Sequence, residues 1–355
     1  MKKIFLLFLM FCLANLAAQE FTIAVIPDTQ CYTDYKAQSI LLYPLNQIDF
    51  FYKQVNFIKE KSIVNGGPIV FAIHLGDFVE RRSSTIIEWE MADRAISILD
   101  NVIPIGVVPG NHDYDRSFTV DNKKTYQIDG NKYFSKYFGP NSKHFKDKEW
   151  YGGSYHDGMD SWEIISVADK QFLFLGLEVE PSDEVLEWAQ SIINAHANLP
   201  VILVTHEYIS FYQDKINKKN NAFIDNKCRL YMDRNTPEEL WNKFVKKNSQ
   251  IVLILCGHCF FEDRGEGLRI DVNDDGYEVP AILSNYQGRK EIINKIDYKY
   301  KKYPSGDGWL RLLEFNLSEN LINIKTYSPV LDKYEIDDDS CYEIKFNYNW
   351  LERFN

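Results

Sequence analysis

The chain has 355 residues, of which 45% are hydrophobic and 15% aromatic, and this composition excludes an intrinsically disordered protein. Its formal net charge of −11 excludes a nucleic-acid-binding protein that relies on overall positive charge, so we expect no nucleic-acid polymer as a partner. An anionic substrate would need local cations, and bound metal ions are the most direct source.

The first 18 residues have the pattern of a secretory signal peptide. A charged start at Lys2-Lys3 precedes an apolar run that ends at Leu16 and is followed by two alanines. The apolar run is too short to span a bilayer comfortably, so an uncleaved membrane anchor is the weaker alternative. We therefore expect an exported protein, periplasmic or secreted, without a membrane anchor after cleavage. Residues 19–355 are expected to form a single catalytic domain.

Buried strands alternate with amphipathic helices along the first hundred residues of the mature chain. Apolar runs at 21–27, 68–75 and 104–109 have the length and composition of buried strands. Residues 46–64 and 86–100 carry apolar side chains at helical spacing. This alternation predicts right-handed crossovers and a largely parallel sheet.

The second half of the chain repeats this pattern. Strands are predicted at 162–167, 171–177, 200–205, 251–256, 268–272, 277–284, 309–315 and 321–327. Helices are predicted near 182–195 and at 237–247. Two polar segments, 114–160 and 211–235, are interpreted as insertions, and the region after about residue 262 is expected to complete a second sheet.

Polar side chains follow five of the predicted strands at the point where each strand ends. They are Asp28 with Gln30, Asp77, Asn111 with His112 and Asp113, His206, and His258. Open α/β sheets bind ligands at the carboxyl ends of their strands, so these side chains are expected to converge. Buried carboxylates and imidazoles are costly without partners, and their convergence therefore predicts shared metal ions. Mixed Asp, Asn and His ligands suit Mn, Fe or Zn rather than calcium.

This constellation resembles the calcineurin-like metallophosphoesterase superfamily. That family's pattern is Asp-x-His, Gly-Asp, Gly-Asn-His-Asp/Glu, a lone His and Gly-His-x-His. The chain shows, in the same order, Asp28-Thr29-Gln30, Gly76-Asp77, Gly110-Asn111-His112-Asp113, Thr205-His206 and Gly257-His258-Cys259-Phe260. The resemblance spans roughly residues 21–330 and implies the family fold, a four-layer α/β/β/α sandwich.

The resemblance also implies a metal-dependent phosphoric ester hydrolase with one or two metal ions per chain. Asp77 would bridge two metals and Asp28 would bind the first, while Asn111, His206 and His258 would complete the second site. His112 would stabilise the transition state or protonate the leaving oxygen, oriented by Asp113. A metal-activated hydroxide would attack phosphorus.

Two departures from the family pattern both fall on the first metal site. Gln30 stands where the family has His, and an amide carbonyl is a weaker ligand than imidazole. Phe260 stands where the family has its last His, and a phenyl ring cannot ligate. The candidate replacements are Cys259, Glu262 and Asp263. We therefore hypothesise a weakened first metal site.

The sequence leaves two kinds of function open. The favoured one is an exported enzyme that hydrolyses a phosphodiester in a small or medium-sized phosphorylated substrate, with a phosphomonoesterase as a weaker option. The alternative is a non-catalytic or single-metal protein that binds a phosphoryl ligand on the same fold, because Phe260 removes a ligand. Nucleotides, lipid head groups, phosphorylated glycans and phosphoproteins all remain open as substrates.

Some polar residues are assigned structural roles instead. His74 lies inside a predicted strand and is expected to be a core residue with a hydrogen-bond partner. His156 has no matching ligand nearby in the sequence. Residues 271–276 imitate the start of a calcium loop, but a hairpin turn at Asp275-Gly276 is the favoured interpretation.

Overall fold

The computed structural model describes residues 20–40, 45–120, 125–167, 170–211, 223, 234–296 and 306–345. The predicted signal peptide and most of the predicted insertion at 211–235 lie outside these described residues. Within the described ranges, no helix combines the length and the apolar character needed to cross a membrane.

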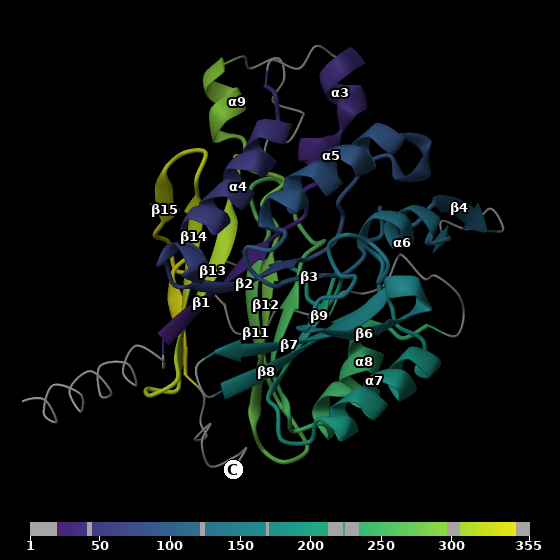
Figure 1. Cartoon of the computed structure of the whole chain (residues 1–355), viewed down its shortest axis with the longest axis vertical. Helices are drawn as coiled ribbons and strands as arrows, with labels where there is room; N and C mark the ends of the chain where they lie inside the picture. Colours follow the sequence, from purple (N-terminus) through teal and green to yellow (C-terminus); the bar gives the residue numbers. More distant parts are fainter. Residues whose placement is uncertain are drawn as a thin grey trace, which may run out of the picture.

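The first sheet has seven strands. They are β1 (Glu20–Ile26), β2 (Ile69–His74), β3 (Ile105–Val107), β13 (Leu310–Asn316), β14 (Leu321–Ser328), β15 (Lys333–Glu335) and β16 (Tyr342–Lys345). Their order is β15-β14-β13-β1-β2-β3, with β16 also paired to β14 (Figure 1). β1, β2 and β3 are parallel, as the alternation of strands and helices predicts, whereas β13 is antiparallel to β1. The expectation that the whole C-terminal region completes the second sheet is wrong for β13 to β16.

The second sheet also has seven strands. They are β6 (Tyr151–Tyr155), β7 (Asp160–Val167), β8 (Lys170–Leu177), β9 (Val201–Thr205), β10 (Ile251–Cys256), β11 (Glu266–Val272) and β12 (Glu278–Ser284). Their order is β11-β12-β10-β9-β8-β7-β6, and β8, β9, β10 and β12 are parallel neighbours. β11 and β12 form an antiparallel hairpin with Gly276 at φ +85°, which confirms the predicted turn.

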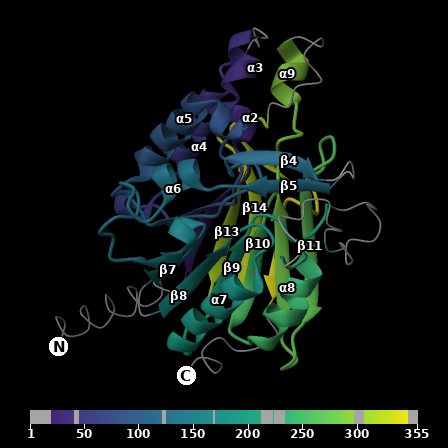
Figure 2. The same cartoon turned by 90° about the vertical axis from the view of Figure 1, so that its right-hand side faces the viewer.

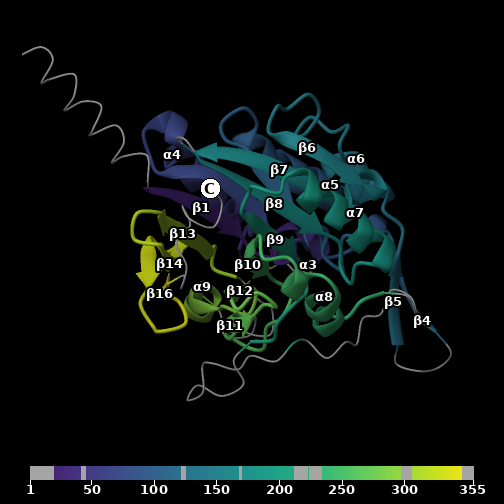
Figure 3. The same cartoon turned by 90° about the horizontal axis from the view of Figure 1, so that it is seen from below.

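Helices cover the outer face of each sheet. α4 (Ile48–Glu60) and α5 (Ile86–Ile96) lie over the first sheet, and α7 (Asp183–Ala195) and α8 (Pro237–Lys243) lie over the second (Figure 2). The inner faces of the two sheets pack on each other through an apolar layer that includes Phe71 and Phe174. Figure 3 shows β8 and β9 of the second sheet between β1 of the first sheet on one side and α7 on the other. The predicted four-layer α/β/β/α sandwich is confirmed.

Four further α-helices belong to the described part of the chain. They are α2 (Gln30–Thr33), α3 (Tyr35–Ile40), α6 (Lys132–Phe138) and α9 (Glu291–Ile296). α6 belongs to the segment 114–160, which the sequence indicated as a polar insertion. That segment also holds β6 and a separate hairpin of β4 (Arg116–Val120) and β5 (Thr125–Asp129).

Aromatic packing explains why the described parts of the segment 114–160 are more regular than their polar composition indicates. Phe134 and Phe138 are spaced four residues apart on α6, and both are fully buried. The Phe138 ring stacks on Phe78 with centroids 4.2 Å apart and also lies against Trp89 of α5. A few large rings therefore anchor a segment whose remaining residues are mostly polar.

The contact between the two sheets generates a stability prediction. Phe174 on β8 is 1% exposed, and its ring centroid lies 4.2 Å from that of Phe71 on β2. We expect Phe174→Ala to lower the free energy of unfolding by about 3–5 kcal/mol, because it removes buried apolar area and leaves a cavity. Chemical denaturation measures the change. The control is Ile336→Ala at an 88% exposed position, for which we expect a change below about 0.5 kcal/mol. Equal losses in the two variants would contradict this packing.

Candidate metal centre

The candidate site lies where the carboxyl ends of the central strands of both sheets meet. Asp28 follows β1 and Asp77 follows β2, while His206 and His258 follow β9 and β10. Backbone hydrogen bonds join these turns within each sheet, from Thr29 N to the Asp77 carbonyl (3.1 Å) and from Gly257 N to the His206 carbonyl (2.9 Å). The site is therefore built on turns that backbone hydrogen bonds join in pairs within each sheet.

Two glycines allow the backbone to approach the carboxylates closely. A Cβ atom at Gly110 would lie 2.1 Å from Asp77 Oδ1, and one at Gly257 would lie 2.4 Å from Asp28 Oδ1. Asp77 itself has φ +57°, in the left-handed region that non-glycine residues rarely adopt. The turns are thus shaped around the two carboxylates at the cost of local strain, a feature that is common at functional sites.

Asp77, Asn111, His206 and His258 lie together, as the sequence predicted for the second metal position. His206 Nε2 lies 3.3 Å from both Asn111 Oδ1 and Asp77 Oδ2. Asp77, His206 and His258 each offer one ligand atom, and these atoms lie within 4.8 Å of one another. The Leu75 carbonyl can only accept, so His206 Nδ1 donates to it at 2.7 Å, which turns Nε2 toward the cluster.

The electrostatics of this cluster favour a bound cation. Burial opposes a charge on His206, yet the Asp77 and Asp28 carboxylates raise its pKa to about 10. Burial and the neighbouring His206 lower the pKa of His258 to about 3. The protein alone therefore balances its buried carboxylates with a proton on one imidazole, and a divalent cation bound between them would replace that proton.

Asp28 lies beside this cluster and is surrounded by amides. Its Oδ2 accepts hydrogen bonds from Asn285 Nδ2 (2.9 Å) and Gln287 Nε2 (3.0 Å). Gln30 donates from Nε2 to Gln287 Oε1 (3.3 Å), and its own Oε1 is buried without a hydrogen-bond partner. Burial raises the pKa of Asp28 to about 7. An orphaned buried oxygen, on a side chain that bonds to the same Gln287 as the Asp28 carboxylate, fits a cation ligand.

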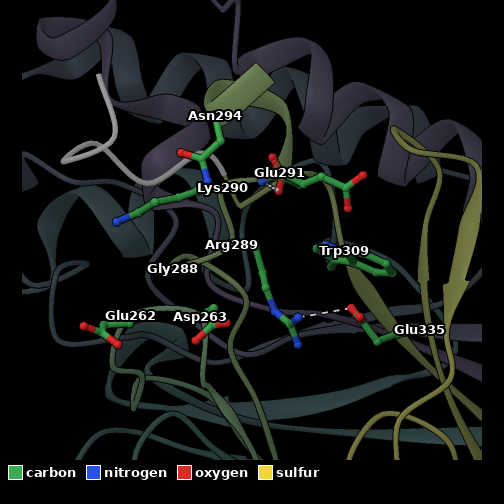
Figure 4. Close-up of a pocket in the computed structure, with 10 residues that line it drawn as sticks. Glu262, Asp263, Gly288, Arg289, Lys290, Glu291, Asn294, Trp309 and Glu335 are labelled. Carbon is green, nitrogen blue, oxygen red and sulfur yellow. Dashed lines mark hydrogen bonds and ion pairs between the residues drawn. The ribbon is translucent and has the colours of Figure 1, made fainter. Parts of the chain in front are cut away.

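The candidate replacements for the missing imidazole do not include an obvious ligand. The Phe260 side chain is 37% exposed, and Cys259 packs against the core of the second sheet. Glu262 and Asp263 line a neighbouring pocket of about 520 Å³, with Trp309 on its other side (Figure 4). The loop after His258 therefore turns its acids toward this pocket, whereas the amide side chains that bond to Asp28 come from the turn after β12.

His112 lies on the same turn as Asn111 and is tied to Asp77 by its backbone. Its N–H donates to Asp77 Oδ1 at 2.7 Å, and its side chain is partly exposed. His112 Nδ1 lies 3.0 Å from the Glu80 carbonyl, which can only accept, so Nδ1 donates and Nε2 points away from Glu80. Sequence reasoning missed Glu80, because a contact made through a backbone carbonyl leaves no signal in residue type.

Asp113 does not orient His112 in the way that the family resemblance implies. Its Oδ1 accepts from Phe78 N (2.8 Å) and Val79 N (3.3 Å), and its Oδ2 accepts from Gly110 N (2.8 Å). Both oxygens of this fully buried carboxylate are thus used on backbone amides. Asp113 instead fastens the turn after β3 to the turn after β2, and the Glu80 carbonyl takes over the orientation of His112.

The prediction for His74 is confirmed. Gly76 N donates to His74 Nδ1 at 3.1 Å, so its Nε2–H donates to Thr29 Oγ1 at 2.9 Å. Burial holds the pKa of His74 well below its usual value. His74 is therefore a neutral core residue that supports the turns on either side of it.

His156 has partners that its sequence context did not indicate. Its Nδ1 lies 3.6 Å from Asp160 Oδ2 and 3.7 Å from Glu178 Oε1, and Arg234 also pairs with Glu178. The nearby carboxylates of Asp160 and Glu178 raise the pKa of His156 to about 10. This group lies at the adjoining ends of β7 and β8, next to Tyr114, whose hydroxyl donates to Glu178 Oε2 at 3.0 Å.

Comparisons with known proteins agree with the site. A family model described as calcineurin-like phosphoesterase matches residues 21–259. The uncharacterised protein YvnB of Bacillus subtilis strain 168 is 30% identical over 332 residues, which make up 91% of this chain and 21% of that protein. The chain thus spans about a fifth of the length of that relative.

One solved structure that is similar to this chain is that of a dimetal phosphatase from Danio rerio. The TM-score is 0.50, the sequences are 13% identical, and the match covers 92% of this chain and 99% of that chain. At this level of identity, the likeness shows a shared fold.

The first prediction from the site concerns the close approach at Gly110. We expect Gly110→Ala to weaken metal binding at least about tenfold, because its methyl group would displace the Asp77 carboxylate. Elemental analysis after desalting measures retained metal, and circular dichroism reports the fold. The control is Gly66→Ala, where the added methyl has no atom within 4 Å although φ is +81°. Unchanged metal retention in Gly110→Ala would count against Asp77 as a ligand.

The second prediction concerns pH and His156. Its folded pKa of about 10 lies above the ordinary value, so its stabilising contribution is complete below about pH 6.5 and is lost as pH rises toward 10. We expect the melting temperature of wild type to exceed that of His156→Gln most at pH 6, with the difference shrinking by pH 10. Thermal unfolding across this range measures it, and a constant difference would contradict the assignment.

Proposed function

This chain belongs to the calcineurin-like phosphoesterase family, and from that premise we propose that it is an exported enzyme that hydrolyses a phosphodiester bond. The observation that carries the proposal is the convergence of Asp77, Asn111, His206 and His258 beside His112. These four side chains supply ligands for a metal ion. The His112 imidazole lies next to them without being one of the ligands.

Asp77, Asn111, His206 and His258 would hold one metal ion, and Asp28, Asp77 and Gln30 would hold another. When bound, these ions supply a nucleophilic water and neutralise charge on the phosphoryl oxygens. The protein itself fixes the ligands. Leu75 sets the His206 tautomer, and the backbone of His112 holds Asp77. Preorganised ligands of this kind reduce the rearrangement needed during the reaction.

His112 is the group that we assign to the leaving oxygen. Its Nδ1 is committed to the Glu80 carbonyl, so Nε2 is the atom that would face a substrate and transfer a proton. Its backbone bond to Asp77 keeps the ring at a fixed place relative to the metal ligands. Proton transfer to the leaving alkoxide is the contribution that this geometry supports.

Local charge favours a phosphodiester over a phosphomonoester. A diester carries one negative charge, whereas a monoester carries up to two at neutral pH. Beyond the metal ligands, the surroundings of His112 include the Glu80 carboxylate, which lies 3.7 Å from His112 Nδ1. Arg82 donates to the carbonyls of Asn111 and Tyr114, so its guanidinium holds the turn. The less charged ester therefore meets less repulsion.

The neighbouring pocket has room for a small or medium-sized group attached to the phosphate. Its volume of about 520 Å³ falls within the range of small-molecule sites, about 300–1,000 Å³. Gly288 lines the pocket and directly follows Gln287, which bonds to Asp28. Substrates of this size fit the expectation of a small phosphorylated compound and not of a nucleic-acid polymer.

One observation favours a second candidate function. The first metal position lacks both family imidazoles, since Gln30 replaces one and the Phe260 ring is turned partly to solvent. A protein with only the second position filled could bind a phosphoryl group without turning it over. Export of either protein rests on the sequence pattern of the first 18 residues.

Hydrolysis of chromogenic esters tests the proposed function. With added Mn²⁺, we expect bis(p-nitrophenyl) phosphate to be cleaved with a higher kcat/KM than p-nitrophenyl phosphate. His112→Ala should lower kcat by about 10²–10⁴-fold, because proton transfer to the leaving group is lost. The matched control is His196→Ala at the end of α7, which should keep wild-type rates.

Each outcome separates the candidates. Faster cleavage of the monoester would overturn the phosphodiester assignment in favour of a phosphomonoesterase. No cleavage with Mn²⁺, Zn²⁺ or Fe²⁺, together with retained binding of inorganic phosphate, would overturn the enzyme in favour of the binding protein.

A further inference from the structure

The first metal position is surrounded by amide groups from two distant parts of the chain. Gln30 lies at the start of α2, whereas Asn285 and Gln287 lie in the turn after β12. All three side chains are buried, and both residues of the later turn bond to the Asp28 carboxylate. Amides therefore surround the Asp28 carboxylate, and one of them, Gln30, stands where the family pattern has an imidazole.

The hydrogen bonds fix which way each amide faces. Asp28 only accepts when ionised, so Gln287 must direct its Nε2 toward Asp28 Oδ2 and its Oε1 away. Gln287 Oε1 then accepts from Gln30 Nε2 at 3.3 Å. This sequence of bonds leaves Gln30 Oε1 buried and without a partner. A buried carbonyl oxygen without a donor, on a side chain that shares Gln287 with the Asp28 carboxylate, is the observation that points to a cation.

Several hydrogen bonds hold the turn after β12 in place. Asn285 donates both to Asp28 Oδ2 (2.9 Å) and to the His258 carbonyl (2.9 Å), and its Oδ1 accepts from Gln287 N (2.9 Å). Asn285 and Gln287 both bond to Asp28 Oδ2, whereas His258 N lies 3.2 Å from both Oδ1 and Oδ2. Gln30 Oε1, which has no donor, and Asp28 Oδ1, which neither amide side chain contacts, are the oxygens that we assign to a metal ion.

We propose that the first metal position is an all-oxygen site formed by Asp28, Asp77 and Gln30, with Asn285 and Gln287 as positioning residues. It binds a hard, exchangeable divalent cation, Mn²⁺ or Mg²⁺, in preference to Zn²⁺. Carboxylate, carbonyl and water oxygens suit Mg²⁺ and Mn²⁺, whereas imidazoles suit Zn²⁺. The second position, with His206 and His258, holds a transition metal more tightly, so the two positions differ in metal preference.

This inference rests on the metal dependence of the proposed function but not on its substrate. Metal binding to the chelator-treated full chain tests it, by calorimetric titration with Zn²⁺ or Mn²⁺ alone and by elemental analysis after desalting. We expect one Zn²⁺ retained per chain, and two Mn²⁺ binding events whose affinities differ at least tenfold. Retention of two Zn²⁺ per wild-type chain would overturn the proposal.

Two variants sharpen the test. Gln30→His supplies an imidazole, so it should raise retained Zn²⁺ from one to two per chain, and an unchanged count would overturn the role of Gln30. The matched control is Gln171→His, which adds an exposed histidine at the start of β8, at the end remote from the site, and should retain one Zn²⁺. Circular dichroism and thermal unfolding show that each variant is folded.

Gln287→Leu tests the positioning role. Loss of its bond to Asp28 should weaken the low-affinity Mn²⁺ event by about 10–100-fold and leave Zn²⁺ retention unchanged, because second-position ligands are untouched. Equal weakening of both events would indicate a general structural defect and overturn this assignment. Since every readout is metal binding, the proposal stands or falls separately from hydrolysis of any ester.

Discussion

Two buried carboxylates, Asp28 and Asp77, lie where the strand ends of two packed sheets meet, and the rest of the site depends on how their charge is balanced. Each is only 2% exposed. An uncompensated buried charge is strongly destabilising, so the surroundings must supply protons, hydrogen-bond donors or cations. The protein uses different means at the two positions. Imidazoles gather around Asp77, whereas neutral amides gather around Asp28. The chemistry of the site follows from this asymmetry.

Much of the fold and of the second metal position could be predicted because the signals are local. Buried strands are continuous apolar runs, and each site residue follows such a run within three positions, so the sheet itself brings together side chains such as Asp77 and His206. The same logic failed for β13, which is antiparallel to β1, because strand order between distant segments has no local signal. It also underestimated the segment 114–160, where two buried phenylalanines outweigh a polar composition.

The surroundings of Asp28 were harder to predict for a different physical reason. Asn285 and Gln287 are 257 and 259 residues away from Asp28 and reach it only because β12 pairs with β10, at the end of which Gly257 approaches Asp28. The sequence indicated that this turn could rim a pocket, but amides in a turn are common and carry no specific pattern. The comparison with the family motifs showed that Gln30 and Phe260 stand in place of the two imidazole ligands of the first metal position. Only the structure shows which groups take the vacant space.

An oxygen-only position beside an imidazole-containing one has a consequence for catalysis. A phosphoryl oxygen is itself a hard, anionic donor, so a bound substrate would add to the few oxygens that Asp28, Asp77 and Gln30 provide. Binding of the ester and binding of the weaker ion would then reinforce each other, because each supplies part of the other's site. The loss of two imidazoles therefore does not by itself argue against turnover. It favours an enzyme in which the cation at the first metal position is held firmly only while a phosphoryl group is bound.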